Sequence, residues 1–274
     1  MEAHVFCLEG WREKCFDNFG VKENVENNMN SEAYALESAV EESHWWFVVR
    51  RKLIKSIIIG HNLPKDTAIL DIGSSTGTNL RMLKEMGFLN YQGIDVSDEA
   101  IFWCAQKKLG RIHKGDVCAL SFQDSSFDLI LATDIIEHVE EDGLALKEID
   151  RVLKPGSSVI ITVPAFNLLW GIQDDIVHHK RRYTKKYLFK KISETKLSCQ
   201  ESFYFNFFLF LPILIARTIL KVFKKHISIE ESQINNNFIN KFLKIIFTLD
   251  IYLARFIKVP FGVSLLAVAK KGNY

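Results

Sequence analysis

Two features of this chain have residue types and spacing that suit the binding of a ligand. One is a turn of small residues, and the other is a series of acidic residues that follow short apolar runs. The apolar run that starts at Ala68 ends in Gly73-Ser-Ser-Thr-Gly77 and is followed by helical spacing. Glycine tolerates positive φ and lets a ligand approach the backbone, and a helix N-terminus offers free N–H groups. The turn indicates a nucleotide-type site in outline only, because it departs from G-x-G-x-x-G.

Two further acids end the next apolar runs. Asp95 closes residues 91–95, roughly twenty residues beyond the turn, where a carboxylate can accept hydrogen bonds from vicinal ribose hydroxyls. Asp116 follows the next run and suits an exocyclic amino group, as on adenine. Because the carboxyl ends of parallel strands share one edge of a sheet, these acids and the turn are expected to meet there.

Three histidines are candidates for acid–base chemistry, because histidine is the natural base near neutral pH. His138 follows a fourth apolar run, and His178 and His179 lie in a segment after a fifth, close to Asp174. The alternatives are a structural role for His138 and a hydrogen-bonded surface loop for the pair. We expect no metal, because two adjacent histidines without a third ligand at a fixed spacing are weak evidence for one.

The elements that position these residues alternate between strand and helix. Strands are expected near residues 68–72, 91–95, 112–117, 127–134, 157–163, 198–205 and 263–269. Helices are expected between most of them, for example at 99–109 and 142–153, the second closed by Lys154-Pro-Gly156. This alternation predicts an α/β fold with a doubly wound sheet.

Bulk composition narrows the class of protein. The 274 residues are 48% hydrophobic and 25% charged with a net charge of +2, which is globular and gives no nucleic-acid footprint. The five cysteines are scattered and form no C-x-x-C pair, which suits reduced thiols. No secretory signal is visible at the N-terminus, so we expect a cytoplasmic location.

The combined pattern resembles the class I S-adenosylmethionine-dependent methyltransferases over roughly residues 31–271. The resemblance rests on Leu70-Asp-Ile-Gly-Ser-Ser-Thr-Gly-Thr78 for the D-x-G-x-G-x-G loop, Asp95, Gly115-Asp-Val117, Asp134-Ile-Ile-Glu-His-Val139 and Leu153-Lys-Pro-Gly156. Ser75 stands where the family usually has glycine, so a slightly altered loop is expected. Three other stretches resemble a narrower group associated with polysaccharide or lipid-linked glycan pathways: Glu42-Ser-His-Trp-Trp-Phe47, His178-His-Lys-Arg-Arg-Tyr-Thr184 and Pro260-Phe-Gly-Val-Ser-Leu265.

The resemblance implies a Rossmann-like, seven-stranded, mostly parallel sheet whose last strand is antiparallel. We divide the chain into a poorly ordered extension (1–30), an N-terminal helical lid (31–60), a methyltransferase core (61–206), a helical hydrophobic insertion (207–258) and the last strand with its tail (259–274). The cofactor implied is S-adenosyl-L-methionine, and the residues expected to bind it are Asp71, Gly73, Ser75, Gly77, Asp95, Val96, Asp116, Val117 and Asp134.

The expected reaction is O-methylation of a sugar or of a lipid-linked or amphipathic acceptor, by in-line transfer with histidine-assisted deprotonation. The candidate catalytic residues are His138, His178 and His179. The candidate acceptor contacts are His44, Trp45, Trp46, Trp170, Asp174, Arg181, Arg182 and Tyr183. For residues 31–60 the alternative to a lid is an amphipathic helix packed on the sheet.

The Phe-rich stretch before the last strand has two interpretations. Its second segment places Lys241, Lys244 and Arg255 at helical spacing opposite a broad apolar face, so it either covers a site or an oligomer interface, or contacts a membrane peripherally. Its first segment, from Phe207 to Ala216, is too short to cross a bilayer. The oligomeric state stays open.

Two other functions compete with methyl transfer. Gly73-Ser-Ser-Thr-Gly77 also satisfies G-x-S-x-G, the nucleophile elbow of α/β-hydrolases, but that fold sets several strands before its elbow and leaves the acids unexplained. The other alternative is a non-catalytic, membrane-associated binding module that keeps the fold.

Overall fold

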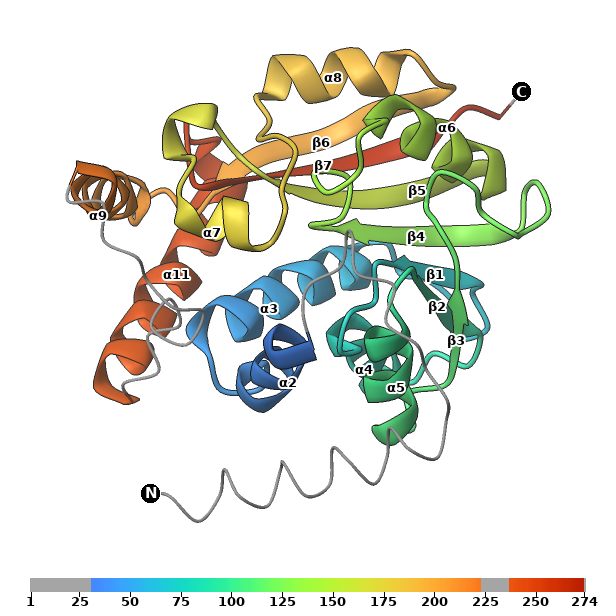
Figure 1. Ribbon diagram of the computed structural model, residues 1–274. Helices are drawn as coiled ribbons and strands as arrows, with labels where there is room; N and C mark the ends of the chain where they lie inside the picture. Colours follow the sequence, from blue (N-terminus) through green and yellow to red (C-terminus); the bar gives the residue numbers. More distant parts are fainter. Residues whose placement is uncertain (1–30, 223–236, 274) are drawn as a thin grey trace.

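Seven strands form one sheet in the order β3-β2-β1-β4-β5-β7-β6 (Figure 1). The computed structural model describes residues 31–222 and 237–273, so the predicted extension at 1–30 lies outside the described residues. The strands are β1 (Ile69–Ile72), β2 (Tyr91–Asp95), β3 (Arg111–Lys114), β4 (Phe127–Thr133), β5 (Leu153–Pro164), β6 (Leu197–Phe205) and β7 (Ser264–Lys271).

The pairing of these strands confirms the predicted mostly parallel sheet. β1 pairs in parallel with β2 and β4, β2 with β3, and β4 with β5. β7 lies between β5 and β6 and is antiparallel to both. The central strands are apolar over nearly their whole length because helices cover both faces of the sheet.

Helices form a layer on each face of this sheet (Figure 1). On one face, Leu53 and Ile57 of α3 (Trp45–Gly60) and Phe247 of α11 (Asn237–Ile257) share a buried cluster with Leu131 and Leu266. On the other face α6 and α8 pack in the same way. The remaining bounds are α2 (Ser31–Val40), α4 (Thr78–Glu85), α5 (Asp98–Gln106), α6 (Asp142–Val152), η1 (Asn167–Leu169), α7 (Ile172–Ile176), α8 (Lys185–Ser193) and α9 (Phe210–Val222).

The segment predicted as a lid divides into two parts with different packing. α3 is a core helix: Trp46 stacks on Phe247 with ring centroids 5.4 Å apart, and the Trp45 backbone N–H donates to Asn240 Oδ1 at 2.6 Å. α2 is bound over the glycine turn instead. The aromatic string therefore anchors α3 to α11, which lies almost two hundred residues further along the chain.

The helical insertion is fixed to the sheet through one narrow face of α11. The Asp250 carboxylate is buried and accepts hydrogen bonds from the backbone N–H groups of Asn206, Phe207 and Phe208. These bonds tie α11 to the end of β6. Within residues 31–222 and 237–273, no helix has the length and apolar character that a bilayer crossing needs.

Candidate active site

A cavity of about 650 Å³ opens at the carboxyl ends of β1, β2, β3 and β4. Its wall includes Gly73 of the turn, the acids Asp95 and Asp116, and the histidines His138 and His178. In a doubly wound sheet this edge is where ligands bind. The structure thus gathers the turn, both strand-end acids and two of the three candidate histidines around one space.

The turn after β1 needs glycine at both of its ends. Gly73 has φ +71°, and a Cβ built there would lie 2.7 Å from Ile135 Cδ1. Gly77 has φ +89°, and a Cβ there would lie 2.3 Å from Leu109 Cδ1. Ser75 also takes a positive φ, +47°, which is costly for a residue with a Cβ. Ser75 was expected to alter the loop, and the alteration is a strained backbone at Ser75 itself.

The strand-end acids hold the loops around the cavity and still face it. Asp95 accepts one backbone hydrogen bond on each oxygen, from Ser75 N and from Ser97 N, both at 2.9 Å. Burial raises the pKa of Asp95. Each carboxylate oxygen has a second lone pair, so the ribose contact implied for Asp95 stays available. Asp116 is exposed in the cavity wall and accepts from Cys118 N at 2.8 Å.

Two glutamates that sequence reasoning missed, Glu37 of α2 and Glu41 directly after it, close one side of the turn. Ser75 Oγ donates to Glu37 Oε1 at 3.0 Å, and Thr78 Oγ1 donates to Glu41 Oε2 at 3.0 Å. Glu41 also pairs with Arg81 and with Lys107, the latter at 2.8 Å. Burial alone raises the pKa of Glu41, but the hydrogen bonds from Lys107 and Thr76 outweigh it and lower the pKa.

Asp71 and Asp134, both predicted to bind cofactor, point into the protein. Asp71 is fully buried, and its Oδ1 accepts from Asn79 Nδ2 at 2.8 Å. Burial raises the pKa of Asp71 to about 7. Asp134 forms an ion pair with Arg50 of α3 and accepts from Thr162 Oγ1 at 3.1 Å. Both residues therefore support the walls of the cavity in this structure rather than line it.

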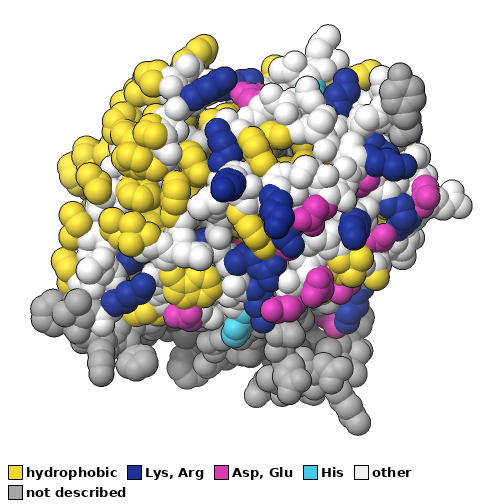
Figure 2. Space-filling model, turned by 90° about the horizontal axis from the view of Figure 1, so that it is seen from above, with side chains coloured by type: hydrophobic (Ala, Val, Ile, Leu, Met, Phe, Trp, Pro, Cys, Tyr) yellow, Lys and Arg dark blue, Asp and Glu magenta, His cyan; other side chains and the backbone are white. Residues whose placement is uncertain are grey.

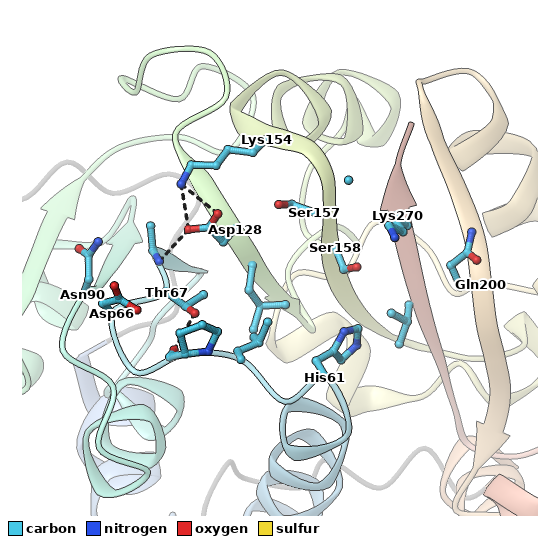
Figure 3. A pocket seen from close by; sticks show the side chains of 16 residues that line it. His61, Asp66, Thr67, Asn90, Asp128, Lys154, Ser157, Ser158, Gln200 and Lys270 are labelled. Atoms are coloured by element: carbon cyan, nitrogen blue, oxygen red, sulfur yellow. Dashed lines mark hydrogen bonds and ion pairs between the residues drawn. The ribbon is translucent and has the colours of Figure 1, made fainter. Parts of the chain in front are cut away.

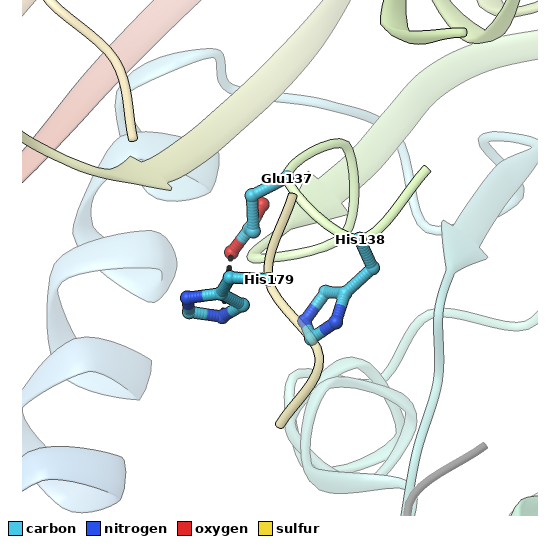
Figure 4. A group of neighbouring side chains, drawn as sticks. All are labelled: Glu137, His138 and His179. Carbon is cyan, nitrogen blue, oxygen red and sulfur yellow. Dashed lines mark ion pairs between the residues drawn. The ribbon is translucent and has the colours of Figure 1, made fainter. Parts of the chain in front are cut away.

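His138, His179 and Glu137 lie together beside the cavity (Figure 4). The rings of His138 and His179 are 4.7 Å apart in an edge-to-face arrangement. Burial and the neighbouring His179 lower the pKa of His138 to about 4, so its ring is neutral at pH 7. Burial and the charge of Asp134 raise the pKa of Glu137 well above its usual range.

Asp174 is the centre of a buried ion cluster and does not face the cavity. It accepts from Arg182 Nε at 2.8 Å, Arg217 NH1 at 2.9 Å and His179 Nδ1 at 2.8 Å. Burial opposes the charge, but the hydrogen bonds from His179 and Arg182 hold the pKa of Asp174 well below its usual range. The cluster joins α7, the following segment and α9.

The other predicted acceptor contacts are placed away from the cavity as well. Tyr183 is fully buried and donates to Ile136 O at 3.2 Å, and Arg181 pairs with Asp142 at 3.0 Å. Trp170 Nε1 donates to Asp175 Oδ1 at 2.9 Å. His44 caps α3 by accepting from Trp46 N, and both tryptophans of that string pack on Phe247. Their roles as acceptor contacts stay predictions.

A second cavity, of about 580 Å³, lies at the opposite edge of the sheet (Figure 3). Its wall holds Asp66 and Thr67 before β1, and Asp128 at the start of β4, whose two oxygens each accept from Lys154 Nζ at 2.9 Å. Parallel sheets bind ligands at their carboxyl edge, not at this one. The first cavity is therefore the candidate active site.

Comparison with known proteins agrees with this geometry. Residues 70–161 match the family model described as a methyltransferase domain. Those residues run from β1 to β5 and include the turn, both cavity acids and the Glu137-His138 pair. Residues 70–161 of this chain are therefore a methyltransferase domain.

Relatives share this domain over part of their length. The chain is 30% identical to 2-methyl-6-phytyl-1,4-hydroquinone methyltransferase of a Synechocystis strain over 118 residues, which cover 41% of this chain and 35% of the relative. It is 31% identical to norajmaline N-methyltransferase of Rauvolfia serpentina over 131 residues, 44% of each. The matched stretch thus spans less than half of these curated relatives.

A solved structure shows the same fold over most of the chain. A chain from the complex of the Haloferax volcanii Trm112 methyltransferase activator with a methyltransferase superposes with a TM-score of 0.59 at 18% identity. The match covers 88% of this chain and 95% of that one. The likeness in fold therefore extends well beyond the residues of the family model.

The cavity of this methyltransferase domain fits S-adenosylmethionine, the cofactor of the family. Gly73, which has no side chain, lets Ile135 pack against the turn, and it lies in the cavity wall itself. Gly73, Asp95, Val96, Asp116 and Val117, all predicted from the sequence to bind cofactor, line the cavity. Ser75 and Gly77 shape the turn behind it without lining it.

Proposed function

We propose that this protein transfers the methyl group of S-adenosylmethionine to an oxygen of an amphipathic or lipid-linked acceptor. The observation that carries the proposal is the convergence of the glycine turn, Asp95, Asp116 and two histidines on one cavity within a methyltransferase domain. Methyl transfer from a sulfonium needs alignment and exclusion of water more than covalent catalysis by the protein.

The residues of the cavity divide between cofactor and acceptor. Asp95 and Asp116 hold the nucleoside side, because carboxylates accept hydrogen bonds from ribose hydroxyls and from an amino group. His178 and Lys180 are exposed in the opposite part of the wall, after β5. His178 accepts the proton of the acceptor hydroxyl as the methyl group is transferred, since imidazole is a suitable base near neutral pH.

The acceptor class is supported by a large apolar surface on α9 and α11. The outer face of α11 carries a stripe at three- and four-residue spacing, each member at least half exposed: Phe238, Phe242, Ile245, Leu249, Tyr252 and Phe256. On α9, Leu211, Ile215 and Ile219 are exposed to a similar extent. In Figure 2 apolar side chains gather on the side of the molecule where these helices lie in Figure 1.

Charge indicates which partner covers this surface, which we call the apolar face. The described residues of α9 and α11 include one acid, Asp250, which is buried, whereas Lys221 and Lys241 are exposed. Lys258 follows α11 directly and is exposed too. Apolar side chains flanked by lysine are typical of helices that lie in the interface of an anionic membrane. We therefore assign the apolar face to an anionic lipid surface, where lipid-linked acceptors are found.

An activity assay tests the proposed reaction. The protein is incubated with S-adenosylmethionine and either the membrane-lipid fraction or the water-soluble fraction of its source cells, and S-adenosylhomocysteine is measured. We expect product with the lipid fraction, and a turnover about a hundredfold lower in His178→Ala with unchanged cofactor affinity. Cofactor binding without product from either fraction would contradict the proposed reaction and favour a binding module.

A further inference from the structure

Three metal-ligating side chains from two separate segments converge beside the cofactor cavity (Figure 4). Glu137 and His138 follow β4, and His179 follows α7. One carboxylate oxygen and one ring nitrogen from each histidine all lie within 4.8 Å of one another. To share one ion, these atoms would have to move closer together by rotation about side-chain bonds.

Glu137 is the unusual member of this group, which we call the Glu137 cluster. Its side chain is fully buried, and neither carboxylate oxygen has a hydrogen-bond partner. The ring of His179 is close to it, with Nε2 at 3.9 Å from Glu137 Oε1. The ionised form of a buried carboxyl without hydrogen bonds is unfavourable, so a cation that binds those oxygens would remove a large penalty.

A carboxylate orients the ring of His179 in the way that is common for histidines that bind metal ions. Its Nδ1 lies 2.8 Å from Asp174 Oδ1, and Asp174 is held in its ionised form by two arginines. A carboxylate only accepts hydrogen bonds, so Nδ1 carries the proton and Nε2 faces Glu137. Carboxylate–histidine–metal arrangements fix ligand rings in this way.

His138 connects the Glu137 cluster to the cavity. Its side chain forms a hydrogen bond with the backbone of Val177, and its ring contacts the His179 ring edge to face. His138 also lines the cofactor cavity. An ion held by the three side chains would thus have a side that faces ligands in the cavity.

We propose that Glu137, His138 and His179 bind a divalent transition-metal ion at the wall of the cofactor cavity. Two imidazoles and one carboxylate suit Zn²⁺, Mn²⁺ or Fe²⁺ and leave positions open for further ligands. Mg²⁺ fits less well because it prefers oxygen ligands. An acceptor oxygen is the ligand expected at an open position, and that consequence rests on the proposed function, whereas metal binding itself does not.

The sequence predicted no metal because the adjacent histidines lack a third ligand at a fixed spacing. In the folded chain the side chains of His178 and His179 face different ways, and His179 joins Glu137 and His138 instead. His178 is exposed in the cavity wall, while His179 turns toward Glu137 and His138, about forty residues earlier in the chain. Spacing along the chain could not reveal ligands that come from two separate segments, one after β4 and one after α7.

Metal binding can be measured on the full chain without cofactor or acceptor. Tag-free protein is treated with chelator, dialysed and titrated with Zn²⁺ and with Mn²⁺ by calorimetry, and Co²⁺ is added to record its visible absorption. We expect one ion per chain and d–d bands of a nitrogen- and oxygen-bound Co²⁺ site. His138→Ala, His179→Ala and Glu137→Gln should each weaken binding about tenfold or more.

His178→Ala is the matched control, because it removes the exposed neighbour and leaves the Glu137 cluster intact. Glu137→Gln keeps the size of the side chain, and circular dichroism of each variant confirms its fold. Absence of stoichiometric binding by the wild-type chain, or equal binding by Glu137→Gln and His179→Ala, would overturn the proposal. Loss of binding in His178→Ala would overturn it too, because the ligands would then be a different set.

Discussion

Ser75 shows how one side chain can strain a loop and also stabilise it. It has φ +47° in a turn that favours glycine, and its hydroxyl donates to Glu37 Oε1 at 3.0 Å. Ser75→Ala keeps the strain and loses the hydrogen bond, so it should lower the free energy of unfolding by about 1 kcal/mol. Ser75→Gly relieves the strain, which offsets the lost bond.

The two variants are compared by urea denaturation. We expect Ser75→Gly to be more stable than Ser75→Ala by about 1 kcal/mol. Equal stability of the two variants would mean that the positive φ is not costly at this position.

Asp71 predicts how stability depends on pH. Its pKa is raised from 3.8 to about 7, and its Oδ2 is buried without a hydrogen-bond partner. The folded state therefore binds this proton more tightly than the unfolded state. The stability gained from the protonated carboxyl is fully present below pH 3.8 and is lost as pH rises through 7.

The test is the difference in unfolding free energy between the wild type and Asp71→Asn, measured without cofactor from pH 5 to pH 8. The wild type should lose stability relative to the variant by at most about 1.4 kcal/mol per pH unit. Parallel stability curves would show that Asp71 is ionised throughout this range.

For some residues the neighbouring sequence predicts where the side chain lies in the folded protein, and for others it does not. Asp95 and Asp116 end or follow apolar runs, and the sheet brings such ends to one edge, so their position in the cavity was predicted. Arg182 and Tyr183 lie in a basic, polar run that looks solvent-exposed. The fold buries both because Asp174 and Asp142 accept their hydrogen bonds, and no local pattern indicates that.

At the scale of elements, the exposed apolar residues of α11 lead to a prediction about membrane binding. Its apolar face should bind vesicles that contain anionic lipid more strongly than neutral vesicles, and salt should weaken the binding. Phe242→Ser combined with Phe256→Ser should remove the protein from the vesicle pellet without unfolding it, because these side chains are 57% and 78% exposed.

Leu89→Ser is a matched control, since Leu89 is 80% exposed in the loop between α4 and β2. It should sediment with vesicles like the wild type. A wild-type protein that stays in the supernatant with both vesicle types would refute membrane contact. If the double variant instead changes the sedimentation mass from dimer to monomer, the apolar face is covered by a second copy of the chain.

The helices of the N-terminal segment were predicted better than their roles. Helical spacing predicted α2 and α3. Of the two interpretations of the aromatic string, packing or a lid, its contacts with α11 favour packing. The two glutamates that bind the turn, Glu37 of α2 and Glu41 directly after it, are four residues apart, which is the spacing of one helical turn. That spacing was the available signal, and it was hidden because charged residues on a helix are usually solvated.

At the scale of the whole molecule, periodicity and turn residues predicted the α/β layers, because apolar runs that stop at glycine or an acid are typical of strands in a covered parallel sheet. The antiparallel β7 came only from the family resemblance, since an apolar run does not show its direction. The two long-range clusters, around Asp174 and around Glu137, depend on chain segments that meet only after folding.

The central claim is that the cavity at the carboxyl edge binds S-adenosylmethionine through Asp95, and calorimetric titration of the cofactor tests it most directly. The wild type should bind, and Asp95→Ala should bind at least about tenfold more weakly, because a charge-assisted hydrogen bond is worth roughly 1.5 to 3 kcal/mol. Asp98→Ala removes an exposed acid three residues away and should bind like the wild type. No heat of binding by the wild type at millimolar cofactor, or equal affinity of Asp95→Ala and wild type, would contradict the account.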